Sequence, residues 1–215
     1  MARLLVVEAS PRRSGSRSTD GCQVFLDALA RQRSDLVIDW LDLWAAGLPE
    51  FEHATIAAKY ARLAGRPFDA AEEKAWDTIG AIVGQLKAAD AVVIATPMWN
   101  FGIPYKLKHW IDLITQPGLT FSFSPDIGYR PLLSARPTLV ILASAGDYSD
   151  GPSFGRPDLA TPYLKAALGF IGLADPIFVP IGPTIGAADK VEAGRERALA
   201  PLAALAQTFM GRRAA

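Results

Sequence analysis

The sequence predicts an α/β fold: a doubly wound, five-stranded parallel sheet with helices on both faces. Apolar runs of strand length alternate with longer amphipathic stretches, which is the pattern of a parallel sheet covered on both sides. The run from Ala91 to Ala95 also lacks the polar alternation of a half-exposed strand. A chain of 215 residues suits one such domain and is short for two, so we expect residues 1–215 to form a single domain.

These patterns predict five strands and five helices. The expected strands are Arg3–Glu8, Leu36–Leu41, Ala91–Thr96, Thr138–Ser144 and Pro176–Pro180. The expected helices are Ser18–Arg33, Ala70–Ala88, Tyr105–Thr115, Leu159–Ile171 and Ala187–Met210. In the second helix, Trp76, Ile79 and Val83 recur at helical spacing and form one apolar face. The connections Asp42–Asp69, Gln116–Arg136 and Gly146–Asp158 are long for this kind of domain, and such loops often carry binding surfaces.

Composition narrows the class of partner. Lys plus Arg (22) balances Asp plus Glu (22), so no strong field attracts nucleic acid or an anionic membrane, and a small molecule is the better expectation. The lone Cys22 has no partner for an internal disulfide or a metal cluster, which favours a reducing compartment. The short apolar run before Glu8 does not resemble a signal peptide. We therefore expect a cytoplasmic protein without a metal centre, and we assign no role to Cys22.

The loop after the first strand is rich in serine. It runs from Ser10 through Gly15 to Thr19, and a helix is expected to begin near Ser18. A phosphate placed there would meet free N–H groups, the positive end of the helix dipole and short hydroxyl donors. Neither a GxGxxG nor a GxxxxGK[ST] motif occurs at this point, so a dinucleotide fingerprint and a P-loop are not supported. The alternative is a simple turn in which Ser16 or Ser18 caps the helix.

The loop after the third strand is aromatic. Pro97, Met98, Trp99, Asn100 and Phe101 follow the expected strand directly. An apolar wall with backbone donors at the carboxyl end of a strand suits a flat ring with polar edges. The alternative is a loop whose aromatic side chains fold into the core or form a dimer contact.

These two loops resemble those of the FMN-dependent NADH-azoreductases and NAD(P)H quinone reductases. That family typically has Pro-Met-Tyr-Asn-Phe where this chain has Trp99 in place of the tyrosine. Its Ser and Ser-x-Ser elements match Ser10 and Ser16-Arg17-Ser18, and the similarity continues through Thr161–Leu164 and Leu168–Gly172. The resemblance covers nearly the whole chain and implies a flavodoxin-like fold that binds FMN.

The resemblance also implies the cofactor contacts. Ser10, Ser16, Arg17 and Ser18 would hold the FMN phosphate. Pro97, Met98, Trp99, Asn100 and Phe101 would line the ring and ribityl chain, with a backbone N–H near Asn100 at the flavin N5 edge. A third segment, typically Ser-Arg-Gly-Gly, corresponds to Ser144, Ala145, Gly146 and Asp147. This chain departs from that segment at Ala145 and Asp147, and both positions belong to the pyrimidine side of the flavin. We expect the Asp147 carboxylate to point toward the flavin and to disfavour its reduced form. The alternative is an aspartate that points into solvent.

The implied activity is a ping-pong transfer of two electrons from NADH or NADPH to a quinone or azo compound, without a catalytic side chain. The resemblance further implies a homodimer in which Phe170 faces the substrate space of the partner subunit. The choice between NADH and NADPH stays open. An arginine such as Arg12, Arg13 or Arg130 could contact the 2′-phosphate of NADPH, but surface arginines are usually only solvated charges. Two rival functions are an electron carrier and a flavin-free binding module. Flavodoxin-like carriers are typically acidic, so the formal net charge of zero disfavours the carrier.

Overall fold

A parallel sheet with the strand order β2-β1-β3-β6-β7 forms the centre of the molecule. The computed structural model describes residues 1–12 and 14–212. The five strands are β1 (Ala2–Glu8), β2 (Leu36–Asp42), β3 (Ala91–Pro97), β6 (Thr138–Ala143) and β7 (Ile177–Ile181). The chain runs outward from β1 to β2 and then returns to β3 on the other side of β1, so the strand order reverses between β1 and β3. This confirms the expected doubly wound sheet and places the ligand-binding switch point at that position.

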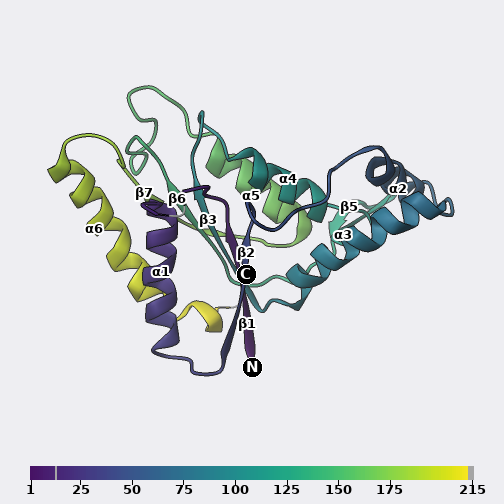
Figure 1. Ribbon diagram of the computed structural model, residues 1–215, viewed down its shortest axis with the longest axis horizontal. Coiled ribbons are helices and arrows are strands. Elements are labelled where there is room, and N and C mark those ends of the chain that lie inside the picture. The colour runs from purple at the N-terminus through teal and green to yellow at the C-terminus, as the bar shows by residue number, and fades with distance from the viewer. Residues whose placement is uncertain (13, 213–215) are drawn as a thin grey trace.

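Helices cover both faces of the sheet (Figure 1). One face carries α1 (Arg17–Ala30) and α6 (Ala188–Leu205), and the other carries α3 (Ala70–Ala88), α4 (Tyr105–Ile114) and α5 (Ala160–Ile171). Successive residues of a strand point to opposite faces, so Leu4 and Val6 belong to the core under α1 and α6, while Leu5 and Val7 belong to the core on the other side. The central strands β3 and β6 and the middle of β1 are therefore largely apolar because both of their faces are buried, whereas the edge strand β2 is only partly buried.

Two of the long connections contain regular structure that the sequence analysis did not assign. The segment Asp42–Asp69 includes the helix α2 (His53–Leu63), whose buried residues are Thr55, Ala58 and Ala61. The buried residues of α2 are small, whereas its larger apolar residues Ile56, Tyr60 and Leu63 are exposed, so no stripe of large apolar side chains marks the buried face of this helix.

The segment Gln116–Arg136 includes an antiparallel hairpin of β4 (Phe121–Ser124) and β5 (Gly128–Pro131). The expectation of one helix from Ala187 to Met210 was wrong at its end, since α6 stops at Leu205 and a 3-10 turn, η1 (Phe209–Gly211), follows. Phe209 leaves the helical path and packs edge-on against Phe25 at 5.1 Å, so tertiary packing decides the ending.

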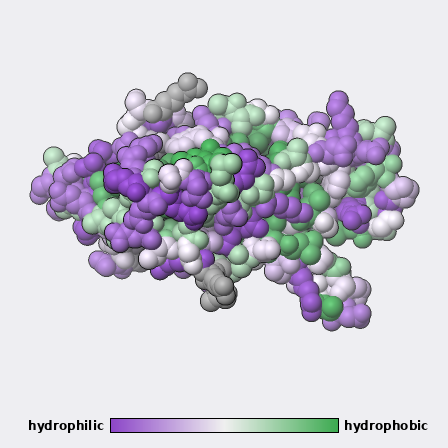
Figure 2. Space-filling model, turned by 90° about the horizontal axis from the view of Figure 1, so that it is seen from below, coloured by the Kyte–Doolittle hydropathy of each residue, from purple (hydrophilic) through white to green (hydrophobic). Residues whose placement is uncertain are grey.

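The surface carries both hydrophilic and apolar residues (Figure 2). Hydrophilic residues spread over the face shown in Figure 2, with apolar groups between them. Within residues 1–12 and 14–212, no helix combines the length and apolarity that a membrane crossing requires.

Candidate functional site

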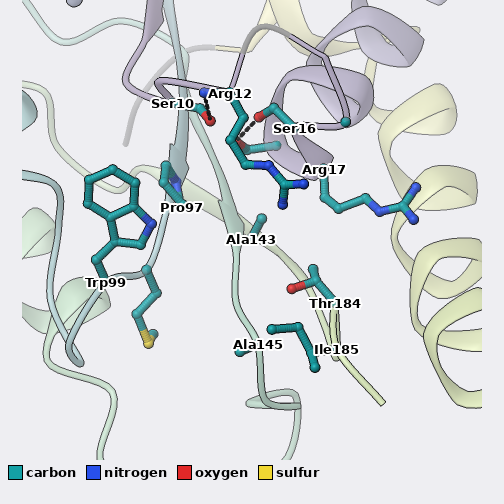
Figure 3. Close-up of a pocket in the computed structure, with 13 residues that line it drawn as sticks. Ser10, Arg12, Ser16, Arg17, Pro97, Trp99, Ala143, Ala145, Thr184 and Ile185 are labelled. Atoms are coloured by element: carbon teal, nitrogen blue, oxygen red, sulfur yellow. Dashed lines mark hydrogen bonds between the residues drawn. The ribbon is translucent and has the colours of Figure 1, made fainter. Parts of the chain in front are cut away.

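A cavity of about 420 Å³ opens at the carboxyl ends of β1, β3 and β6, beside the point where the strand order reverses (Figure 3). Four segments that are distant in sequence meet there, namely those that follow β1, β3, β6 and β7. Its lining consists of Ser10, Arg12, Gly15, Ser16, Arg17, Ser18, Pro97, Met98, Trp99, Ala143, Ala145, Thr184 and Ile185. The structure thus brings together all four residues expected at a phosphate and three of the five expected at a ring.

The first loop presents hydroxyl groups held by a local network. Ser16 caps α1, because its Oγ accepts a hydrogen bond of 3.3 Å from the backbone N–H of Thr19. The Ser16 and Ser18 Oγ atoms lie 3.3 Å apart, and both side chains are buried. The Thr19 hydroxyl donates to the Glu8 carboxylate at 2.8 Å, which ties the start of α1 to the end of β1. The helix cap is therefore confirmed at Ser16, and because the same residue lines the cavity, the phosphate contact stays a prediction.

Arginine side chains add positive charge to this end of the cavity. Arg12 and Arg17 both line it, and Arg17 lies 3.9 Å from Asp20 in an exposed ion pair. Figure 3 shows the Arg12 side chain beside the serine loop. The neighbouring Arg13 lies outside the described residues, and Arg130 lies on β5, away from this cavity. Hydroxyl donors, a helix N-terminus and two guanidinium groups make this end suitable for a phosphate monoester.

The third-strand loop is a tight turn. Trp99 and Gly102 exchange two backbone hydrogen bonds of 2.9 Å, and the residues between them, Asn100 and Phe101, have φ values of 47° and 70°. Positive φ at both central positions is the geometry of a type I′ turn, which is unfavourable for a phenylalanine. The side chains of Asn100 and Phe101 consequently lie at the tip of the turn and do not line the cavity. In the described chain, neither of their N–H groups donates a hydrogen bond, so both stay available to a ligand.

Trp99 forms the apolar wall with Pro97 and Met98. Its ring packs 6.1 Å from that of Trp44, which in turn packs edge-on against Tyr105 at 5.3 Å. The Trp44 Nε1–H donates to the carbonyl of Ala9 at 3.0 Å. Trp44 therefore anchors the wall of the cavity to the end of β1, a role that the sequence analysis missed because this residue lies in a connection without a motif.

The segment after β6 contributes mainly to structure. The Ser144 hydroxyl donates to the carbonyl of Gly146 at 2.8 Å and is buried, and its backbone carbonyl accepts from the N–H of Thr184 at 2.9 Å. Of the four residues expected at the pyrimidine side, only Ala145 lines this cavity. Ser144 and Gly146 instead fix the path of the loop.

Asp147 does not point into the cavity of Ser10 and Trp99, which corrects the expectation of an inward carboxylate. Its Oδ2 accepts a hydrogen bond of 2.6 Å from Nη2 of Arg197 on α6, and its Oδ1 accepts one of 2.7 Å from the Ser149 hydroxyl. Partial burial acts to raise the pKa of the Asp147 carboxyl, but the hydrogen bonds from Ser149 and the charge of Arg197 outweigh it, so the pKa lies below its ordinary value. The carboxylate is ionised and paired with a neighbouring cation.

Phe170 lies away from the cavity of its own chain. Its ring packs 4.9 Å from Phe121 and 5.5 Å from Tyr129, both in the β4–β5 hairpin. The substrate contact expected from Phe170 depends on a partner subunit and stays a prediction. His109 Nε2 lies 2.8 Å from the carbonyl oxygen of Pro49, within hydrogen-bond distance.

Thr184 and Ile185, which follow β7, were also missed as lining residues. The general rule that ligands bind beyond the carboxyl ends of parallel strands could have found them, because β7 ends at Ile181 beside β6. With them, the cavity has one end with donors suited to a phosphate, and an apolar wall. This donor set and this wall fit FMN, a planar ring joined to a phosphate monoester.

Comparisons with known proteins agree with this geometry. A family model described as a flavodoxin-like fold matches residues 2–205. The chain is 51% identical over 209 residues to an FMN-dependent NADH:quinone oxidoreductase of Bradyrhizobium diazoefficiens, covering 97% of this chain and 100% of that protein.

Solved structures show the same relationship. The azoreductase from Bacillus anthracis str. Sterne superimposes with a TM-score of 0.86 at 27% identity, over 97% of this chain and 100% of that one. An FMN-dependent NADH-azoreductase from Bacillus anthracis str. Ames Ancestor, solved in complex with FMN, has a TM-score of 0.80 at 26% identity and covers 96% of this chain and 100% of its own. The chain therefore belongs to the flavodoxin-like family that includes the FMN-dependent NADH:quinone oxidoreductases.

Proposed function

We propose that this protein is an FMN-dependent oxidoreductase that passes two electrons from NADH to a quinone, and that azo compounds are also acceptors. The observation that carries the proposal is the convergence of the serine loop and the Trp99 wall on one cavity at the switch point. Residues 1–215 would act as one FMN-binding domain. Relatives over the whole length of the chain are named for this activity.

Bound FMN supplies the two-electron redox chemistry. The chain's own residues bind and orient. Ser10, Ser16 and Ser18 would donate to the phosphate, with Arg17 balancing its charge. Pro97, Met98 and Trp99 would support the ring and exclude water from one face. The N–H groups of Asn100 and Phe101, which donate no hydrogen bond in the described chain, would be free to bind the edge of the ring.

Donor and acceptor would use the same space in turn, which gives ping-pong kinetics. No protein nucleophile is required, and Cys22, which lies on α1 with its side chain fully buried, is not placed to act as one. Double-reciprocal plots at several fixed quinone concentrations should give parallel lines. Intersecting lines would contradict a shared space.

We also infer a homodimer. The hairpin aromatic residues Phe123 and Tyr129 are 52% and 62% exposed, and with Phe170 they form an apolar surface that a second copy would cover. Sedimentation should give the mass of two 23.0 kDa chains. A mass of one chain at micromolar concentration would contradict the dimer. A cytoplasmic location, favoured by the single cysteine, stays part of the proposal.

The decisive experiment is a visible spectrum of the purified protein followed by a steady-state assay with NADH and a neutral quinone. Flavin absorbance and NADH consumption are expected. A colourless protein that does not take up FMN would favour the binding module. Bound flavin without NADH oxidation would favour the electron carrier, although the zero net charge argues against it.

A further inference from the structure

A second cavity, of about 790 Å³, adjoins the first. Ala145, Gly146 and Asp147, which the resemblance placed at the pyrimidine side of FMN, form part of its lining, and the rest of the lining has no assigned role. The two cavities share Ala145 and Ile185 in their walls. The segment after β6, the loop after β7 and the first turns of α6 form the larger cavity. A ligand could therefore place one end in the flavin-facing cavity and the other end here.

The charges around this second cavity are mainly positive. Arg156, Lys190 and Arg197 line it, and the only carboxylate in the lining is Asp147. Arg197 already pairs with Asp147 at 2.6 Å. Within residues 1–12 and 14–212, neither Arg156 nor Lys190 has a carboxylate within 4.0 Å. Three cations and one carboxylate leave two positive charges in the lining, both available to an anion.

An aromatic side chain stands at the rim of the same cavity. Phe154 is 95% exposed and has a φ of 51°, a conformation that a phenylalanine rarely adopts. The Arg156 guanidinium lies 6.0 Å from its ring, and the Arg156 Nε–H donates to the carbonyl of Ser153 at 3.1 Å. An exposed aromatic ring held in a strained turn, beside a cation that is fixed by the same turn, indicates a surface for a flat anionic ligand.

We propose that the second cavity binds the adenosine diphosphate half of the donor dinucleotide. Arg156 and Lys190 contact the diphosphate, and Phe154 stacks against the adenine. The nicotinamide then reaches the flavin-facing cavity across the wall of Ala145 and Ile185. The inference rests on the proposed function, because only a dinucleotide donor supplies both a diphosphate and a second flat ring; a neutral quinone supplies neither.

Binding of ADP to the flavin-loaded protein, measured by calorimetry, tests the charge contacts without turnover. The double variant Arg156→Gln/Lys190→Gln should raise the dissociation constant of ADP about tenfold or more, since it removes two charge-assisted contacts. The matched control is Lys74→Gln/Lys87→Gln, which removes the same charge from exposed positions on α3. Absence of ADP binding to the unaltered protein, or an equal change in both double variants, would overturn the proposal.

Steady-state kinetics separates the donor from an anionic acceptor. With a neutral quinone, the double variant should raise the KM for NADH while kcat stays within about twofold, because the lost contacts are made equally in the ground and transition states. If instead only the KM for a sulfonated quinone rises, the cavity serves the acceptor and the donor assignment is wrong. If the unaltered protein binds no flavin or does not oxidise NADH, the proposed function is refuted. The ADP titration tests the second cavity separately, because it needs no turnover.

The adenine contact has its own test. Phe154→Leu keeps an apolar side chain but removes the ring, and should raise the dissociation constant of ADP severalfold, whereas Phe154→Tyr should preserve it. Equal ADP affinity in the leucine and tyrosine variants would overturn the stacking contact.

Discussion

The backbone groups of Trp99 and Gly102 exchange two hydrogen bonds of 2.9 Å, which fold the intervening residues into a turn at the mouth of the cavity. Asn100 sits in this turn with a φ of 47°, whereas proline requires a φ near −65°. Asn100→Pro should therefore open the turn, reduce the free energy of unfolding by about 2 kcal/mol or more, and lower FMN affinity. Thermal unfolding and flavin content measure both effects.

Asn100→Gly is the control for that variant, because glycine adopts positive φ readily and keeps the N–H. It should retain both the flavin and the melting temperature. A proline variant as stable as the glycine variant would contradict the turn geometry.

The loops after β6 and β7 touch closely enough to require a glycine. A Cβ added to Gly182 would lie 2.4 Å from the carbonyl oxygen of Gly146, a backbone atom that cannot move aside easily. Gly182→Ala should reduce the free energy of unfolding by about 2 kcal/mol and separate the loops that carry Ala145 and Ile185. Gly84→Ala in the interior of α3 meets nothing within 4 Å and should instead stabilise by about 0.5–1 kcal/mol. Chemical denaturation distinguishes the two, and equal stability would contradict this packing.

The flavin potential should depend little on Asp147. Its carboxylate lies outside the flavin-facing cavity, and both it and the paired Arg197 guanidinium are exposed, so solvent screens the Arg197 charge even when the carboxylate is removed. Asp147→Gly should therefore shift the FMN midpoint potential by less than about 20 mV. An anaerobic redox titration checks this. A large rise of the midpoint potential in the glycine variant would show that the Asp147 carboxylate does act on the flavin.

The same pair predicts a pH dependence of stability. The pKa of Asp147 is lower in the folded than in the unfolded chain, so the ion pair stabilises above the unfolded value near pH 4 and loses its effect as the pH falls through the folded value. Because the pair is exposed, Asp147→Asn should cost at most about 1 kcal/mol at pH 7. Unfolding of both proteins from pH 7 to pH 3 should show this difference shrinking below about pH 4. A difference that grows with acidity would reverse the assigned sign.

Cys22 should be chemically silent. Burial, with a smaller contribution from Glu8, raises the pKa of its thiol to about 12. At pH 8 the thiolate fraction is then on the order of one in 10⁴, and the side chain is fully covered. A disulfide reagent should react with it only after unfolding. Rapid labelling of the native protein would contradict its buried position.

The sequence by itself determined the sheet and the two loops that meet at the cavity. Runs such as Ala91–Ala95 predict buried parallel strands because both faces of the sheet are covered, and the structure agrees in the parallel sheet and within one residue at each strand end. Ser10, Ser16 and Trp99 could be found because a parallel sheet gathers the carboxyl ends of its strands at one edge. The local sequence pattern is sufficient to predict a segment wherever its place in the sheet determines whether it is buried or lies at the edge that binds the ligand.

Only the tertiary structure decided which side chains of those loops face the cavity. Asn100 and Phe101 follow Trp99 directly in the sequence, yet the positive φ of their turn directs them outward. Asp147 turns toward Arg197, which lies 50 positions later in the chain and was brought near by the packing of α6 on β7. Side-chain direction depends on backbone angles and distant partners, and neither is encoded in a short motif.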